Sequence, residues 1–313
     1  MLQIKSGRLQ KPVKAVFYGL EGTGKSTLAA QTPNPLFLDT EGGTTYLDVN
    51  RIDQFTGWEG LLATIDEVAR DTSCCSTLVL DTADWAEQMA IKHICEKYKQ
   101  SGLEGFGFGK GYTYLAEEFS RLLRACDNVL ASGRNVIIVA HARVRKQELP
   151  EEMGAFDHWE LKLSRQCAPL LAEWPDLLLF ISYKTFVSGA ENGSKKASGG
   201  KRVMYATHHP CWDAKNRFGL PDEMELDFQR LAHLFTTQPA PQPQKDIFTE
   251  LSAVMERDGI TEAQLRKAVA QKGHYAEDTP IAEYHPDFLR QWMLPNWDKL
   301  VTLIHNDPDY CPF

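Results

Sequence analysis

Residues 19–26 read Gly19-Leu20-Glu21-Gly22-Thr23-Gly24-Lys25-Ser26 and match the pattern GxxxxGK[ST]. An apolar run precedes them at 13–18 and a helical pattern follows at 26–31, so we expect a strand, a tight loop and a helix in that order. Glycines let the backbone N–H groups of such a loop point inward around phosphate oxygens, and the helix N-terminus adds a positive partial charge. This context predicts a loop that binds phosphate groups.

The side chains of this loop have distinct expected roles. Lys25 is expected to reach the β- and γ-phosphates of ATP, and the Ser26 hydroxyl is expected to bind Mg²⁺. The alternative is a glycine-rich turn that binds no ligand. ATP and Mg²⁺ are therefore the predicted cofactors. The other positions predicted to contact the nucleotide are Gly19, Glu21, Gly22, Thr23, Gly24 and Thr27.

Two further strand-like runs end in acidic residues. Asp81 follows the apolar run 77–80, where its carboxylate can hold Mg²⁺ through water; alternatively it caps the next helix. Glu41 follows the run that begins at Pro35, and a carboxylate at a strand's carboxyl end can orient or deprotonate the attacking water. Asp39 is a second candidate for that role, and a solvated loop acid is the alternative for Glu41. We predict that Glu41 is catalytic.

His141 ends the apolar run 136–140. A polar side chain at that position can hydrogen-bond the γ-phosphate or the attacking water, and it can report the nucleotide state to the segment that follows. A buried histidine with its hydrogen bonds satisfied inside the core is the alternative. We predict that His141 is the second catalytic residue.

The apolar runs also predict the architecture. Strands are expected near 13–18, 35–39, 76–81 and 135–141, with amphipathic helices at 59–70 and 114–132 between them. Short apolar strands separated by helices indicate an α/β fold with a mostly parallel central sheet. A later hairpin is expected from strands at 177–186 and 202–207. Its connection, 188–200, is rich in Gly and Ser and predicts a segment without a fixed shape.

A segment rich in Pro and Gln at 238–245 separates two regions of the chain. Alternating prolines favour an extended linker, so residues 1–237 are expected to form the core domain. After the linker, a helix at 246–257, a capping box at Thr261 and a helical pattern around Trp297 predict a small helical domain over 246–305. The last residues, 306–313, form an acidic tail that ends in Pro-Phe.

Composition places few limits on function. The 313 residues carry a net charge of −8, but residues 184–217 hold seven basic residues against two acidic ones. No apolar stretch is long enough to cross a membrane and no secretion signal is visible, so a cytoplasmic protein with no membrane partner is expected. The seven cysteines form no CxxC pair. The cluster around His208, His209 and Cys211 is either a zinc-binding loop or an ordinary loop.

The order of these motifs resembles the RecA-like P-loop NTPase core, and more closely the phage-encoded RecA-like single-strand annealing ATPases. The resemblance covers about residues 10–230, and its blocks are 37–43, 107–112, 139–141 and 214–221. It implies ATP-dependent assembly into rings or filaments on single-stranded DNA, with ATP bound between neighbouring subunits. Glu41 matches the water-activating glutamate of that family, whereas His141 stands where recombinases usually carry glutamine.

The resemblance also implies contacts with neighbours and with DNA. Lys215 and Arg217 match basic residues that reach the γ-phosphate of an adjacent subunit; a solvated basic turn is the alternative. Two loops, 101–112 and 143–159, are expected to face DNA through aromatic stacking and phosphate contacts, or else to be packed surface. The DNA-binding candidates are Phe106, Phe108, Lys110, Tyr112, Arg143, Arg145 and Lys146.

Together these features favour a DNA-stimulated ATPase that coats single strands and promotes annealing. Three alternatives remain: a P-loop phosphotransferase, for which no arginine-rich lid is visible; a GTPase, for which no Asn-Lys-x-Asp motif is present; and an ATP-switched adaptor without catalysis. The helical domain or the acidic tail is a candidate docking segment for host single-strand binding or repair proteins. If the chain is phage-encoded, its location is the cytoplasm of a bacterial host.

Overall fold

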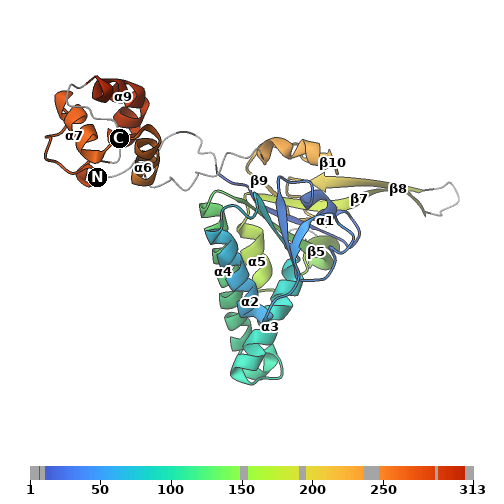
Figure 1. Cartoon of the computed structure of the whole chain (residues 1–313). Helices are drawn as coiled ribbons and strands as arrows, with labels where there is room; N and C mark the ends of the chain where they lie inside the picture. The colour runs from blue at the N-terminus through green and yellow to red at the C-terminus, as the bar shows by residue number, and fades with distance from the viewer. Residues whose placement is uncertain are drawn as a thin grey trace. The chain divides into compact units, whose positions relative to one another are not determined.

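The computed structural model describes Gly7 and residues 11–148, 154–189, 195–235, 247–285 and 288–306. The chain forms two compact units, Met1–Ala240 and Pro241–Phe313 (Figure 1). The predicted linker at 238–245 and all but the first residue of the predicted tail lie outside the described residues. None of the described helices combines the length and the apolar character that a membrane span requires.

The first unit is built on a ten-stranded sheet with a parallel centre. β1 (Lys14–Gly19) lies between β5 (Asn135–Glu148) and β7 (Leu177–Gly189) and runs parallel to both. β4 (Thr77–Asp81) and β2 (Pro35–Asp39) follow beyond β5 in the same direction. The carboxyl ends of β1, β4 and β2 therefore meet at one edge of the sheet, where ligands bind in open α/β folds. The predicted α/β fold with a mostly parallel sheet is confirmed.

Further strands extend this sheet. β3 continues it beyond β2 in the parallel direction, whereas β8 and β10 continue it beyond β7 as antiparallel strands. β6 and β9 pair antiparallel with β5 and β7. The sheet is therefore parallel at its centre and antiparallel along its later strands. The bounds of these strands are β3 (Asn50–Ile52), β6 (Ala155–Leu161), β8 (Lys195–Tyr205), β9 (Lys215–Asn216) and β10 (Glu223–Glu225).

Two segments that were predicted as loops are largely strands. Residues 155–161 pair with the outer half of β5, so the segment 143–159 is mainly an antiparallel hairpin. In the later hairpin, β7 pairs with β8 as far as Gly189 and Lys195. The prediction of a connection without fixed shape at 188–200 is therefore wrong for its two ends. Backbone N–H and C=O groups pair across a ladder whatever the side chains are, and Gly/Ser content alone does not reveal such pairing.

The two faces of the sheet are covered by different segments. Alternate residues of β1 point to opposite faces: Val16 and Tyr18 belong to one apolar cluster, and Ala15 and Phe17 to the other. Helices α2 to α5 pack on the first face, whereas α1 and the segment 220–235 pack on the second. Each large apolar side chain that is fully buried contributes about 2 kcal/mol or more to stability. The helices are α1 (Lys25–Ala29), α2 (Gly57–Arg70), α3 (Ala83–Tyr98), α4 (Lys110–Ala131) and α5 (Cys167–Glu173), with 3₁₀ turns η1 (Leu103–Phe106), η2 (Phe228–Arg230) and η3 (Ala232–Leu234).

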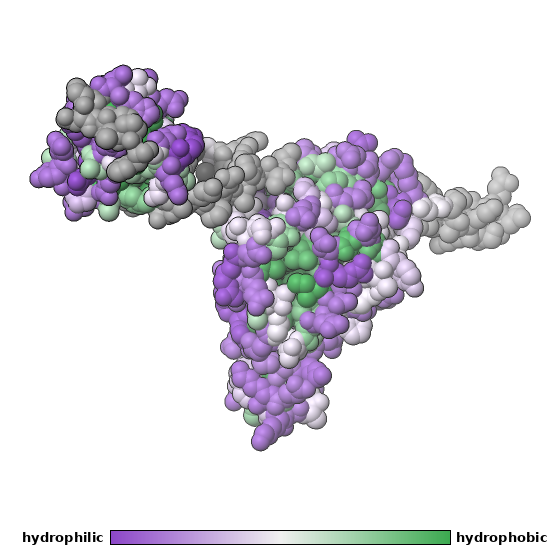
Figure 2. Space-filling view, in the orientation of Figure 1, coloured by the Kyte–Doolittle hydropathy of each residue, from purple (hydrophilic) through white to green (hydrophobic). Residues whose placement is uncertain are grey.

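Helices α3 and α4 form a projection that extends away from the sheet (Figure 1). α4 has 22 residues, which corresponds to about 33 Å, and η1 joins it to α3 at the far tip. The surface of this projection is mostly hydrophilic (Figure 2). The connection 101–112 therefore lies at the end of the projection, at the opposite end of α3 from the sheet edge where that helix begins.

The second unit is a small helical domain with its own core. Thr261 and Gln264 form the predicted capping box at the start of α7, and Gly273 follows that helix with a φ of 76°. Leu265, Trp297 and Leu300 are buried in one apolar cluster. The helices are α6 (Ile247–Asp258), α7 (Glu262–Gln271) and α9 (Trp297–His305), with shorter turns η4 (Ile281–Glu283), η5 (Leu289–Met293) and η6 (Leu294–Asn296).

Candidate nucleotide-binding site

The loop between β1 and α1 depends on three glycines. Gly22 and Gly24 have φ values of 71° and 97°, a region that residues with a side chain rarely adopt. A methyl group on Gly24 would lie 2.8 Å from the guanidinium Nη1 of Arg202, and one on Gly19 would lie 2.1 Å from the carbonyl oxygen of Ile181. The glycines therefore provide both the turn and the close packing of the loop against β7 and β8.

Lys25 is buried at the centre of this loop. Its ammonium donates hydrogen bonds to the carbonyl oxygens of Leu20 at 2.8 Å and Gly19 at 3.2 Å. Burial lowers the pKa of Lys25, while the charges of Asp81 and Glu41 oppose that effect. The loop thus holds one buried cation next to carboxylates, an arrangement suited to a phosphate ligand.

The remaining loop positions differ in exposure. The Thr23 hydroxyl is buried and donates to the carbonyl of Leu20 at 2.8 Å, which closes the turn. Glu21 and Thr27 are exposed, and the Glu21 carboxylate lies 3.9 Å from the Lys162 ammonium. The backbone of the loop and the side chains of Lys25 and Ser26 therefore carry the expected phosphate contacts.

Asp81 lies at the carboxyl end of β4, buried beside the phosphate loop. Burial raises the pKa of Asp81 to about 6, a hydrogen bond with Ser26 opposes this, and the charges of Glu41 and Asp39 add to the rise. A divalent cation between Asp81 and the Ser26 hydroxyl would offset this unfavourable burial of negative charge. The donor set, a carboxylate and a hydroxyl beside a phosphate loop, fits Mg²⁺.

Asp81→Asn is expected to raise the stability of the nucleotide-free protein at neutral pH. The carboxyl of Asp81 is protonated in the folded state below a pKa of about 6, whereas its ordinary pKa is 3.8. Stability is therefore lost as the pH rises from about 4 through 6, by up to about 3 kcal/mol, and the amide avoids that loss. Thermal unfolding at pH 7.5 and pH 4.5 measures it: the stability gap between variant and wild type should be wide at pH 7.5 and fall to about a third of that at pH 4.5.

Asp84→Asn is the control of opposite sign. Burial raises the pKa of Asp84, but hydrogen bonds from His141 outweigh that effect and lower it below 3.8. Its ionised form therefore stabilises the fold above about pH 4, and the variant should unfold at a lower temperature at pH 7.5. If the unfolding temperature of Asp81→Asn at pH 7.5 is at or below that of the wild type, the ionised carboxylate of Asp81 does not destabilise the fold, and the prediction is wrong.

Asp39 and Glu41 have different environments although both follow β2. Asp39 is buried and its carboxylate accepts hydrogen bonds from four backbone N–H groups, those of residues 41–44, and from the Thr44 hydroxyl. Burial raises its pKa, but these hydrogen bonds prevail and lower it. Asp39 therefore shapes the turn that carries Glu41. The side chain of Glu41 is 31% exposed and receives one long contact, 3.4 Å from the Thr82 hydroxyl.

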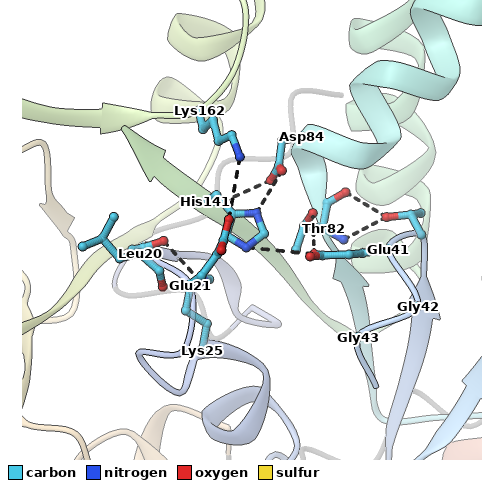
Figure 3. Close-up of polar contacts among 12 residues, drawn as sticks. Leu20, Glu21, Lys25, Glu41, Gly42, Gly43, Thr82, Asp84, His141 and Lys162 are labelled. Atoms are coloured by element: carbon cyan, nitrogen blue, oxygen red, sulfur yellow. Dashed lines mark hydrogen bonds and ion pairs between the residues drawn. The ribbon is translucent and has the colours of Figure 1, made fainter. Parts of the chain in front are cut away.

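His141 lies between two carboxylates at the sheet edge (Figure 3). Its Nδ1 is 2.9 Å from Oδ2 of Asp84, and its backbone N–H donates to Oδ1 of the same residue at 3.1 Å. Its Nε2 lies 4.0 Å from Oε2 of Glu41. Because an ionised carboxylate only accepts hydrogen bonds, Asp84 fixes Nδ1 as a protonated nitrogen and directs Nε2 toward Glu41.

The structure therefore brings Lys25, Ser26, Asp81, Glu41 and His141 together at one edge of the sheet. Sequence reasoning missed several residues that support them. Asp84 could have been found from the sequence, because it follows Asp81 by three residues. An acid in the first turn of a helix that directly follows a strand lies at the same edge of the sheet as the end of that strand. The others come from distant elements and had no local signal. These supporting residues are Thr82, Asp84, Tyr183 and Arg202.

Lys215 and Arg217 do not reach the phosphate loop of their own chain. The Lys215 ammonium donates to the carbonyl of Glu173 at 2.6 Å, and Arg217 pairs with Asp176 at 2.6 Å. β9 pairs with the first residues of β7, whereas the phosphate loop follows the end of β1 at the opposite edge. Their predicted contact with the nucleotide of a neighbouring subunit stays a prediction.

At the tip of the α3–α4 projection, only some DNA-binding candidates of the segment 101–112 have side chains that are not packed or hydrogen-bonded to neighbours. Phe106 packs edge-on against Tyr98 and Tyr114, with ring centroids 5.6 Å from each, and the Tyr112 hydroxyl donates to Glu104 at 2.5 Å. Stacking of bases on Phe106 is therefore not supported by its packing. Phe108 is fully exposed, and Lys110, also exposed, begins α4.

The DNA-binding candidates of the segment 143–159 lie on the outer half of β5, where they form ion pairs with acidic residues of β6. Arg143 donates to Glu160 at 2.8 Å, and Arg145 lies 3.8 Å from the same carboxylate. Lys146 lies 3.7 Å from Asp157. These pairs reduce the positive charge of the hairpin. A cavity of about 630 Å³ lies beside it, lined by Arg145, Lys146, Gln147, Glu148, Phe156, His158, Glu160, His208, Pro210 and Asp213.

The cluster around His208 does not form a compact set of metal ligands. His209 stacks on Trp212 with ring centroids 4.1 Å apart, and its Nδ1 accepts the backbone N–H of Cys211 at 3.1 Å. His208 lies 3.7 Å from Asp213 instead. Within the described part of the chain, the ligand-type side chains that converge are Glu59, His93 and Glu118, where Arg121 already pairs with both carboxylates.

Comparisons with known proteins assign the chain to a family. A search of curated proteins gave no match. Among solved structures, the KaiC-like protein PH0186 of the archaeon Pyrococcus horikoshii aligns with 13% identity and a TM-score of 0.36, over 62% of this chain and 79% of that chain. Residues 11–218 match the family model described as AAA domain, which is more than half of the chain. The chain therefore belongs to this AAA-domain family and has the phosphate loop and α/β core of a P-loop NTPase.

Proposed function

We propose that this chain is a Mg²⁺-dependent ATPase that binds single-stranded DNA, assembles with copies of itself and promotes strand annealing. The observation that supports ATP hydrolysis is the convergence of Lys25, Asp81, Glu41 and His141 around one phosphate loop. Phosphoryl transfer requires little more than positioning and charge stabilisation, and these side chains supply both.

The residues have separate tasks in this proposal. The Lys25 ammonium neutralises charge on the β- and γ-phosphates. Ser26 and, through water, Asp81 would hold Mg²⁺, which would supply further positive charge to the same phosphates. Glu41 orients the attacking water and accepts its proton, because its carboxylate has no backbone hydrogen bond within the described part of the chain. His141, held by Asp84, places Nε2 next to Glu41 and the γ-phosphate position.

The DNA part of the proposal rests on the exposed cations and aromatic ring of two segments. Phe108 and Lys110 lie together at the tip of the α3–α4 projection, where a ring can stack on a base and an ammonium can meet a phosphate. Arg145 and Lys146 are exposed on the β5–β6 hairpin next to the 630 Å³ cavity. Such contacts tolerate any base sequence, as coating of single strands requires.

The ATPase rate with and without single-stranded DNA tests this function. We expect turnover to rise when single strands are added and to rise much less with duplex DNA. DNA affinity should fall steeply with salt, because phosphate contacts release counterions. Electron microscopy of the same mixtures should show assemblies that require ATP. Acceptor-dependent turnover without any DNA effect would instead identify a phosphotransferase, and nearly absent turnover would identify an ATP-switched adaptor.

A further inference from the structure

The β7–β8 hairpin carries a pair of side chains on the side of the phosphate loop away from Glu41 and His141. In the sheet, β5, β4 and β2 lie on one side of β1, and β7 and β8 lie on the other. Asp81 and Glu41, two of the carboxylates near Lys25, come from the first side. We propose that Arg202 of β8 is a ligand of the α- and β-phosphates of the bound nucleotide; this rests on the proposed function.

Arg202 is placed directly against the loop. Its Nη1 lies 2.8 Å from the position that a methyl group on Gly24 would occupy, and its guanidinium carbon lies 3.7 Å from the same position. Gly24 precedes Lys25, so the guanidinium is adjacent to the backbone that cradles the phosphates. A planar guanidinium with several N–H donors is well suited to bind two neighbouring phosphate groups.

Tyr183 supports this placement from the neighbouring strand. It lies directly opposite Arg202 in the β7–β8 register, so the two side chains share one face of the hairpin. The Tyr183 hydroxyl donates to the carbonyl oxygen of Gly22 at 3.0 Å. The pair therefore contacts the loop at two of its glycines, and Tyr183 acts as a positioning residue.

An irregularity in the ladder occurs next to this pair. The register shifts between Lys184 and Thr185, because Lys184 pairs with Lys201 whereas Thr185 pairs with Gly199. The extra residue is Gly200, whose φ of 132° favours glycine. Such bulges turn the strand locally and redirect the side chains that follow. Lys201 and Arg202 come directly after it.

Two other cations of this hairpin, Lys184 and Lys201, have carboxylate partners, whereas Arg202 has none among the described residues. Lys184 pairs with Glu223 at 2.5 Å, and Lys201 pairs with Glu225; both glutamates belong to β10. Neighbouring residues of a strand point to opposite faces, so Lys201 faces away from the loop while Arg202 faces it. The exposed guanidinium of Arg202 lies beside the phosphate loop without a carboxylate partner among the described residues, so it is available to a phosphate ligand.

Equilibrium titration with fluorescent ADP and ATP analogues tests this assignment. Arg202→Ala should weaken both nucleotides by about 10- to 100-fold, because both contain the α- and β-phosphates. Arg202→Lys should recover part of the affinity, and turnover at saturating ATP should stay within a few-fold of wild type, so the effect falls on KM rather than kcat. Lys201→Ala is the matched control, with an adjacent cation that faces away, and should bind both nucleotides as the wild type does.

Each contrary result has a distinct meaning. Unchanged affinity of Arg202→Ala for both nucleotides, in a wild-type protein that binds them, overturns the assignment of Arg202 alone. Loss of ATP affinity with normal ADP affinity places the guanidinium at the γ-phosphate and also overturns it. Failure of the wild-type protein to bind either nucleotide overturns the proposed function instead. Circular dichroism and thermal unfolding confirm that the compared variants are folded.

Discussion

Lys25→Ala is expected to abolish nucleotide binding, with affinity for ATP reduced by at least about 100-fold. The ammonium of Lys25 is buried in the loop and donates hydrogen bonds to the carbonyls of Gly19 and Leu20, so its charge lies at the centre of the loop. Alanine leaves the backbone donors of the loop but removes the cation that meets the β- and γ-phosphates. Isothermal titration with ATP and Mg²⁺ measures the loss directly.

Lys162→Ala is the matched control for that variant. Its ammonium lies 3.9 Å from the Glu21 carboxylate on the outside of the same loop and is half exposed. Removing it changes the charge near the loop by the same amount, but an exposed pair of this kind contributes little. Affinity within a few-fold of wild type is expected for Lys162→Ala. If Lys25→Ala binds ATP as well as the wild type does, the loop is not the nucleotide site.

Glu41→Gln is expected to leave ATP binding within a few-fold of wild type and to reduce hydrolysis by about 100- to 1,000-fold. The amide has nearly the same shape as the carboxylate but cannot accept a proton from water. Among the described residues, the Glu41 side chain makes no hydrogen bond to the backbone, so the turn at 39–44, which is held by Asp39, should persist in the variant. Single-turnover hydrolysis with an excess of protein separates the chemical step from product release.

Glu21→Gln serves as the control for this second variant. Its carboxylate lies in the phosphate loop but is 79% exposed and interacts with Lys162 rather than with the strand ends. Its hydrolysis rate should match that of the wild type. Normal turnover in Glu41→Gln would remove that residue from the mechanism, and a comparable defect in both variants would point to a general charge effect at the loop.

Much of the core fold could be predicted because its signals are local. The apolar runs that became β1, β2, β4 and the inner half of β5 each end in a turn or a polar residue, and each run is buried on both faces. Parallel strands then bring their carboxyl ends to one edge, so the proximity of Asp81 and Glu41 to the loop followed from topology. The chemistry at that edge was therefore readable from strand ends.

What the sequence did not reveal depends on pairing between distant residues. The 143–159 segment has loop-like composition, but Arg143 is 17 residues from Glu160, and only the folded ladder places them side by side. Phe106 could not be distinguished from an exposed stacking ring until Tyr98 and Tyr114 were seen to pack around it. Arg202 approaches Gly24 from a strand almost 180 residues away, and nothing local marks it.

The length of β5 connects the candidate site to the β5–β6 hairpin through one strand. It runs without a glycine or a proline from Asn135 to Glu148, buried through Ala142 and exposed beyond it. A hydrogen-bonded ladder has few soft torsions to absorb a displacement, so we expect a shift of His141 to displace the outer hairpin. β5 is one continuous strand that carries the His141 imidazole near its middle and Arg145 and Lys146 near its outer end.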